Sequence, residues 1–240
     1  MRARGGSRLY GHTIGIIVLD TQFPRLPGDI GNASTWPFPV RYRVVPQATP
    51  ERVVQQQAAG LLGPFLEAAH DLVRDGVRAI TTSCGFLSLY QQEIAAAVSV
   101  PVFTSSLMQI PLVARLLRPE QKVGVITVDA PSLTAAHLRE VGAEAVPVVI
   151  LGTETEEELT RVLIGDELEL DVQKAEADMV RVATRLVRDH PEVGAIVLEC
   201  TNMPPYARAV QQATGLPVFD IVTLTHWVYR ACATPAYPTG

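Results

Sequence analysis

The sequence contains one strand–cysteine–helix phrase twice, and this internal repeat constrains the fold more than any other feature. Residues 79–104 read AITTSCGFLSLYQQEIAAAVSVPVFT, and residues 195–220 read AIVLECTNMPPYARAVQQATGLPVFD. Aligned without a gap, both begin with Ala-Ile, both carry a cysteine at the same place (Cys84 and Cys200), and both reach Pro-Val-Phe at the same distance. The repeat predicts two similar halves that bring two like side chains to equivalent positions.

Short strands and helices alternate along the chain around this repeat. Several strands are almost continuously apolar, which is typical of strands covered on both faces in a parallel sheet. The expected strands are 13–20, 40–46, 77–84, 101–105, 122–129, 144–151, 193–200 and 217–222, and the expected helices are 50–76, 87–98, 132–142, 171–190 and 204–215. The pair Gly63-Pro64 is expected to kink or divide the first of these helices.

This alternation predicts an α/β fold of two pseudo-symmetric lobes of Rossmann or flavodoxin type, each with a mostly parallel sheet and with the active site between them. A second repeated motif supports the duplication, since IGIIVLD, ending at Asp20, matches VGVITVD, ending at Asp129. The expected parts are an N-terminal lobe over 10–119 completed by a helix at 223–232, a C-terminal lobe over 120–222, and a tail at 233–240.

Composition narrows the class of protein. A hydrophobic fraction of 48% in 240 residues supports a sizeable core, and a net charge of −5 without long like-charge runs argues against a nucleic-acid partner. No apolar run is long enough to cross a bilayer, and the basic start at 1–12 lacks a signal-peptide cleavage site, so we interpret it as a leader into the first strand. Three cysteines without a C-x-x-C pair indicate reduced thiols in the cytoplasm and no zinc site.

The segment 21–39, TQFPRLPGDIGNASTWPFP, interrupts the alternation. Its four prolines and two glycines exclude a regular helix or central strand. It follows the carboxyl end of the first strand, where open α/β sheets bind their ligands. Its polar side chains Arg25, Asp29 and Asn32 can close over a small anion, so we expect an ordered lid. Asp20, directly before the lid, fits a site residue and a helix cap equally well.

The two repeated cysteines are the candidate catalytic groups. Cys84 and Cys200 each follow a strand, where the N–H groups of the next helix lower a thiol's pKa and favour bound anions. If the lobes face each other, the thiols lie on opposite sides of a shared cleft. One can then remove a proton from a carbon while the other returns a proton to the opposite face. A lone cysteine at a strand end is as often a small hydrophobic residue, but a matched pair favours this two-base chemistry.

The residues beside each cysteine are expected to hold a small anion, partly through backbone groups. The predicted substrate-binding residues are Asp20, Arg25, Asn32, Ser83, Gly85, Phe86, Thr201 and Asn202. Strand alternation points Glu199 away from the cleft, in a supporting position. The chain has no phosphate-binding loop of Walker or G-x-G-x-x-G type, and the proposed chemistry needs no metal or organic cofactor.

With its half-repeats, the motifs TTSCG and LECTN, and the PRLPGDIGN…TWPFPV loop, the chain resembles the aspartate/glutamate racemase superfamily over roughly residues 13–228. That superfamily includes amino-acid, hydantoin and allantoin racemases, maleate isomerase and arylmalonate decarboxylase. The resemblance implies two Rossmann-like lobes, a site between them, cofactor-independent chemistry by Cys84 and Cys200, and a homodimer.

The chain also departs from the pattern of the superfamily. Amino-acid racemases follow the first cysteine with Asn-Thr, where Gly85-Phe86 stand here, and Glu199 replaces the glycine before the second cysteine. The Cys-Thr-Asn triplet is similar to that of maleate isomerases, and the presence of both cysteines argues against the decarboxylase branch. We therefore expect a cofactor-independent racemase or epimerase that acts on a small carboxylate or an amino-acid or hydantoin-like substrate. A maleate-type cis–trans isomerase acting through a cysteine adduct and a catalytically silent binding protein are the alternatives.

Overall fold

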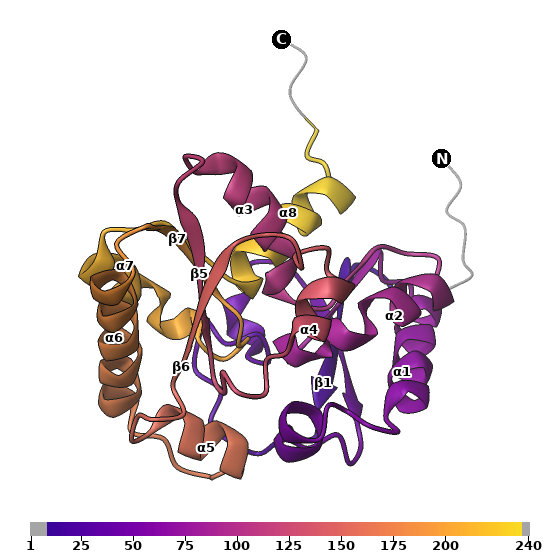
Figure 1. Cartoon of the computed structure of the whole chain (residues 1–240). Coiled ribbons are helices and arrows are strands. Elements are labelled where there is room, and N and C mark those ends of the chain that lie inside the picture. The colour runs from indigo at the N-terminus through magenta and orange to yellow at the C-terminus, as the bar shows by residue number, and fades with distance from the viewer. Residues whose placement is uncertain (1–8, 237–240) are drawn as a thin grey trace.

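The computed structural model describes residues 9–236, so the start of the expected leader (1–8) and the end of the expected tail (237–240) lie outside the described residues. Figure 1 shows two α/β lobes side by side. The strands are β1 Ile14–Leu19, β2 Val40–Val45, β3 Ala79–Thr82, β4 Val102–Phe103, β5 Lys122–Thr127, β6 Val148–Gly152, β7 Val193–Leu198 and β8 Val218–Phe219. They form two four-stranded sheets of order β2-β1-β3-β4 and β6-β5-β7-β8, with all neighbours parallel. The equal strand orders confirm the predicted α/β fold.

Helices cover these sheets and connect their strands. The α-helices are α1 Leu62–Arg74, α2 Gln91–Ala97, α3 Ile110–Leu116, α4 Ala135–Glu140, α5 Leu159–Gly165, α6 Val172–Asp189, α7 Ala207–Thr214 and α8 Ile221–Cys232. Short turns of other helix types are η1 Ala33–Thr35, η2 Glu51–Gln55, η3 Gly85–Tyr90, η4 Ser106–Gln109 and η5 Pro204–Tyr206. Three of these turns, η3, η4 and η5, follow the carboxyl ends of strands and therefore lie at the edge where a ligand binds.

Strand β1 sends alternate side chains to two separate hydrophobic clusters. Ile17 and Leu19 belong to the cluster that contains Leu72 of α1, so they face that helix. Ile14 and Ile16 belong to a second cluster with the α8 residue Leu224, on the other face of the sheet. The last helix of the chain therefore covers the first sheet, and the larger cluster continues from the first lobe into the second.

In the second lobe, the long helix α6 packs against β5, β6 and α7. Its N-terminus is capped by Asp171, whose carboxylate accepts hydrogen bonds from the backbone N–H groups of Gln173 and Lys174 at 3.1 Å each. Apolar residues at helical spacing, among them Met179 and Leu186, are fully buried. The predicted helix at 171–190 is confirmed almost to the residue because both its cap and its apolar stripe are local in the sequence.

Hydrogen bonds between the lobes join the two loops that carry the cysteines. The hydroxyl of Thr201 donates to the backbone oxygen of Ser83 at 2.6 Å, and the hydroxyl of Ser106 donates to the backbone oxygen of Leu198 at 2.6 Å. Helix α4 packs on η3 and helix α5 on η2, each across the boundary between lobes. The carboxyl ends of the two sheets are thereby held together.

Three sequence-based boundaries are wrong, each for a local reason. The chain between η2 and α1 turns through left-handed residues, including Gln57 and Ala58, so the helix expected over 50–76 is interrupted before Gly63-Pro64. Strand β6 begins at residue 148 because Pro147 has no N–H and a turn precedes it. Strand β8 is only two residues long because Asp220 already caps α8, accepting a hydrogen bond from the Thr223 N–H at 2.8 Å.

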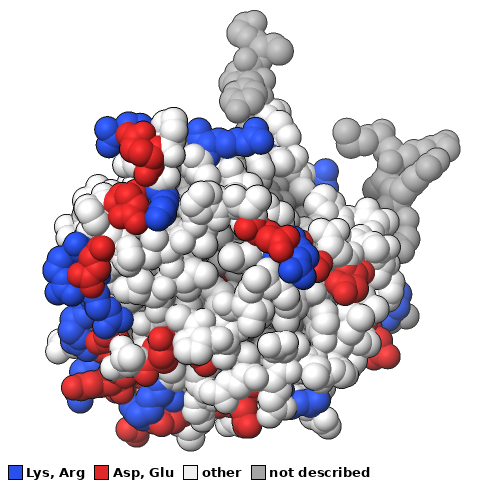
Figure 2. All heavy atoms as spheres, in the orientation of Figure 1, with Lys and Arg blue, Asp and Glu red and all other residues white. Residues whose placement is uncertain are grey.

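Charged residues on the face in Figure 2 mix both signs instead of separating into patches. Many are paired along α6, where Arg181 lies 2.8 Å from Glu156 and Arg188 lies 2.7 Å from Asp189. Among the described residues, no helix has the length and apolar character needed to span a bilayer.

Candidate active site

Cys84 lies at the carboxyl end of the first sheet. It follows β3 and adopts an extended backbone conformation immediately before η3. The residue before it is fixed on both sides: the Ser83 N–H donates to Ile17 O at 2.8 Å, and the Ser83 hydroxyl accepts from the Leu19 N–H at 3.0 Å. The Thr82 hydroxyl donates to the oxygen of Cys84 at 3.0 Å. The thiol is therefore presented by a rigid loop on a buried strand.

Cys200 occupies the equivalent position in the second sheet, two residues after β7. The Glu199 N–H donates to Ile126 O at 2.8 Å, so the backbone stays attached to β5 up to this point. The Thr201 hydroxyl then bonds the Ser83 oxygen, and the Thr201 oxygen accepts from the Ile30 N–H at 3.4 Å. Thr201 thus links the second cysteine loop both to the first one and to the lid.

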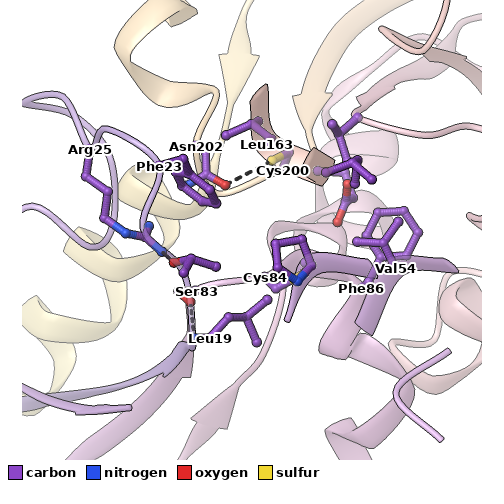
Figure 3. Close-up of a pocket in the computed structure, with 16 residues that line it drawn as sticks. Leu19, Phe23, Arg25, Val54, Ser83, Cys84, Phe86, Leu163, Cys200 and Asn202 are labelled. Atoms are coloured by element: carbon purple, nitrogen blue, oxygen red, sulfur yellow. Dashed lines mark hydrogen bonds between the residues drawn. The ribbon is translucent and has the colours of Figure 1, made fainter. Parts of the chain in front are cut away.

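The two cysteines line one small cavity of about 30 Å³ between the lobes. Figure 3 shows them among residues that come from both lobes and from the lid. The polar lining residues are Thr21, Arg25, Ser83, Glu199 and Asn202, and most other walls are apolar: Leu19, Phe23, Pro50, Val54, Phe86, Val128, Leu163 and Ile164. Of the predicted site residues, the cavity brings together Cys84, Cys200, Arg25, Ser83, Gly85, Phe86 and Asn202.

A hydrogen-bond network that begins in the lid orients the S–H group of Cys200. The buried carboxylate of Asp29 accepts from Arg25 Nη1 at 2.8 Å and from Asn202 Nδ2 at 2.6 Å. Because a carboxylate only accepts, Asn202 must turn its NH₂ group toward Asp29 and its Oδ1 toward Cys200. The Cys200 Sγ–H donates to that oxygen at 3.4 Å (Figure 3). Cys200 is thereby held as a thiol.

The environment of the thiols disfavours a free thiolate at rest. Burial raises the pKa of Cys84, and the nearby Glu199 raises it further, while the N–H groups of Phe86 and Leu87 act in the opposite direction. Burial likewise raises the pKa of Cys200, again with an added contribution from Glu199. The N–H groups of Phe86 and Leu87 at the start of η3 thus favour a thiolate at Cys84 when one forms, although the Leu87 N–H donates to the backbone oxygen of Cys84 at 3.1 Å.

Three predicted substrate-binding residues lie outside the cavity lining. Asp20 is exposed and accepts from the Gln47 N–H at 2.9 Å. Asn32 caps η1 and donates to the Arg25 oxygen at 2.8 Å, so it shapes the lid. Thr201 makes the contacts between lobes described above. Among the described residues, no group of three or more His, Cys, Asp or Glu side chains is arranged to hold a metal ion.

For several residues at the cavity, no sequence pattern predicts a position in the site. Leu163 and Ile164 come from α5, a helix too short to show a clear periodicity. Asp166 ends that helix with φ of 51°, and its carboxylate accepts from the Gln22 and Phe23 N–H groups at 2.7 and 3.1 Å, tying the lid to the second lobe. Only contacts over more than a hundred residues of sequence reveal this role.

Replacement of Asp29 by Asn is expected to lower the free energy of unfolding by about 2–3 kcal/mol. The substitution leaves Arg25, whose side chain is only 15% exposed, without its anionic partner. Because an amide keeps only one acceptor oxygen, its NH₂ group must also face either Arg25 or the NH₂ group of Asn202. Urea denaturation followed by tryptophan fluorescence measures the loss. Asp20→Asn is the matched control, expected to change stability by no more than about 0.5 kcal/mol because Asp20 is exposed. Equal losses in both variants would contradict the network.

Comparison with known proteins agrees with this fold. The family described as Asp/Glu/Hydantoin racemase matches residues 106–228, just over half of the chain. Allantoin racemase from Klebsiella pneumoniae superposes with a TM-score of 0.63 at 16% identity, covering 91% of this chain and 86% of that one; at this identity the likeness concerns the fold. The chain belongs to the Asp/Glu/hydantoin racemase family, as its repeat and motifs predict.

Relatives of higher identity have a different name. Dimethylsulfoniopropionate lyase from Durusdinium sp. clade D is 32% identical over 229 residues, which are 91% of this chain and 74% of that protein. Dimethylsulfoniopropionate lyase 3 from Emiliania huxleyi (strain CCMP1516) is 33% identical over 229 residues, 88% of this chain and 57% of that protein. This chain thus spans little more than half the length of the second relative. Membership of the family supports an enzymatic function. The names of these two relatives indicate a lyase, whereas the sequence alone predicts a racemase.

Proposed function

We propose that the protein is a cofactor-independent lyase that removes the proton α to the carboxylate of a β-sulfoniopropionate, releasing dimethyl sulfide and acrylate. The observation that carries the proposal is a pocket with two thiols and one arginine whose other walls are mainly apolar. A dimethylsulfonio group suits such walls because methyl groups cover its charge and because an aromatic ring such as Phe86 attracts cations. The names of the two lyase relatives support the same substrate class.

Arg25 is the group proposed to hold the substrate carboxylate. Its Nη1 donates to Asp29 and its Nη2 to Thr21, both at 2.8 Å, which leaves further N–H donors of the guanidinium for an anion. The Asp29 contact fixes the position of the guanidinium at the pocket wall. Charge that develops at the carboxylate when the α-proton leaves is then stabilised by a donor already in place.

Cys84 is the proposed base. Its thiolate takes the α-proton, the electron pair of that C–H bond forms the new C=C bond, and the C–S bond breaks with its electrons remaining on sulfur. Dimethyl sulfide and acrylate are the products. Cys200 keeps its proton in the hydrogen bond to Asn202 and is a neutral wall of the pocket in this reaction.

A racemase or epimerase remains the second candidate, favoured by the protonated state of Cys200. Racemisation shares the first step, after which a thiol on the opposite side returns a proton to the α-carbon. The arrangement of Cys200, with its S–H held by Asn202, meets that requirement for a substrate without a leaving group.

Proton NMR in D₂O separates the two functions. The protein is incubated with dimethylsulfoniopropionate and, separately, with aspartate, glutamate, hydantoins, allantoin and maleate. Signals of acrylate and dimethyl sulfide that vanish in Cys84→Ala but persist in Cys232→Ala are the expected result, because Cys232 lies on α8, away from the pocket. Exchange of an α-proton for deuterium without elimination assigns a racemase. A sulfonium substrate left intact by the folded protein overturns the lyase.

A further inference from the structure

Glu199 places an unpartnered carboxyl oxygen beside both cysteines. Its side chain is fully buried and lines the same cavity. One oxygen, Oε2, accepts from the Thr127 hydroxyl at 2.7 Å, whereas Oε1 has no hydrogen-bond partner among the described residues. Oε1 lies against Gly85, the residue after Cys84: a Cβ atom on that glycine would be 2.2 Å away from it. Contrary to the expectation from strand alternation, Glu199 faces the cleft.

Within residues 9–236, no cationic side chain is paired with this carboxyl group. Arg25, across the cavity, is paired with Asp29. His137 of α4 packs edge-on against Phe86 with ring centroids 5.2 Å apart, and burial lowers its pKa to about 4, so it is neutral. The titratable groups beside Glu199 are thus the two thiols. Burial raises the pKa of Glu199 to about 8, opposed by the hydrogen bond from Thr127, and the thiol pKa values lie higher still.

We propose that Glu199 is the proton acceptor for Cys84, a positioning residue that holds the single negative charge of the pocket and exchanges it with the thiol. This inference rests on the proposed carbon-acid chemistry. The S–H proton of Cys84 moves to Oε1, which leaves a thiolate and a neutral carboxyl group. The thiolate removes the α-proton as described above and becomes a thiol again. Glu199 then releases its proton to water, so the overall products are dimethyl sulfide, acrylate and one proton.

Two groups that share one charge titrate as a pair. The first proton leaves the pair near the pKa of Glu199, and a fixed minor fraction of the resulting anion carries its charge on sulfur. The second proton leaves only at higher pH because the like charges repel. The reactivity of Cys84 as a thiolate is therefore expected to rise in two steps. A cysteine without such a partner rises in one.

Alkylation of Cys84 by iodoacetamide tests this without any substrate. Site-resolved mass spectrometry follows the rate between roughly pH 6 and 10.5 in the wild type, Glu199→Gln and Thr127→Val. The wild type is expected to show a first step near pH 8, and its second step lies above the range tested. Glu199→Gln is expected to lose the first step. Thr127→Val is expected to move the first step to higher pH. In the wild type the Thr127 hydroxyl stabilises the Glu199 carboxylate, so loss of this hydrogen bond raises the pKa of Glu199. Cys232 is an internal control whose profile stays the same in all three proteins.

A profile of Cys84 that is identical in the wild type and Glu199→Gln overturns the proposal. Circular dichroism confirms that each variant is folded, and Thr127→Val carries the test alone if Glu199→Gln fails to fold. A step near pH 8 that is lost in Glu199→Gln, together with no elimination of dimethylsulfoniopropionate, refutes the proposed function and leaves the role of Glu199 standing. Elimination without that step does the reverse.

Discussion

Replacement of Cys84 by Ser is expected to lower kcat/KM for elimination by about 10³-fold, since a serine hydroxyl has the shape of the thiol but not its acidity. Cys200→Ser is expected to cost about tenfold or less, because a hydroxyl can still donate the hydrogen bond that the thiol makes to Asn202. Steady-state kinetics with dimethylsulfoniopropionate measures both. The difference between the two variants follows directly from the lyase reaction, which needs one base and no proton returned to carbon.

A control variant and the outcome expected for a racemase distinguish the two reactions. Cys232→Ser is the matched control, and its rate is expected to equal that of the wild type. A racemase acting through both thiols would lose its activity in Cys84→Ser and Cys200→Ser alike. Equal and large losses in the elimination reaction would therefore refute the assignment of Cys84 as the sole base.

Replacement of Gly85 by Ala is expected to abolish activity and to lower the free energy of unfolding by about 3 kcal/mol. The added Cβ would lie 2.2 Å from Oε1 of Glu199 and 2.4 Å from its backbone oxygen. The side-chain atom can turn away, but the backbone belongs to a strand end held by Ser106, whose hydroxyl donates to the oxygen of the preceding residue, Leu198, at 2.6 Å. The two cysteine loops must therefore separate.

Chemical denaturation and elimination kinetics on the same preparation measure this effect. Gly63→Ala is the matched control, because a Cβ at Gly63 has nothing within 4 Å. Within α1 it is expected to leave activity unchanged and to raise stability by about 0.5–1 kcal/mol. An active Gly85→Ala protein of normal stability would show that the close contact between the lobes is dispensable.

The sequence predicts the architecture well because the features that determine it are local or repeated. Apolar strands, the Asp171 cap and the register of the repeat all act over short stretches, and they lead to two sheets of equal strand order. The break before α1 was misplaced because the left-handed conformation of Gln57 and Ala58 is not encoded by glycine or proline at those positions.

The site is less predictable because its groups come from distant segments. Both cysteines line one cavity, as their equivalent positions in the repeat predict. The bond between Asp29 and Asn202 spans 173 residues of sequence, and no local pattern announces it. Alternation misplaced Glu199 because β7 is buried on both faces; the opposing lobe, through Gly85, determines which buried residue meets the cleft.

The return of α8 to the first sheet has a consequence for how the protein is made. Phe38 stacks on Tyr229 of α8 with ring centroids 3.7 Å apart, and Ile14 and Trp36 belong to the same cluster. A ribosome adding about 10 residues per second needs roughly 15 seconds to travel from β3 to α8. Throughout that time one apolar face of the first sheet lacks its cover. The nascent chain therefore offers an apolar binding surface to chaperones until α8 has been made.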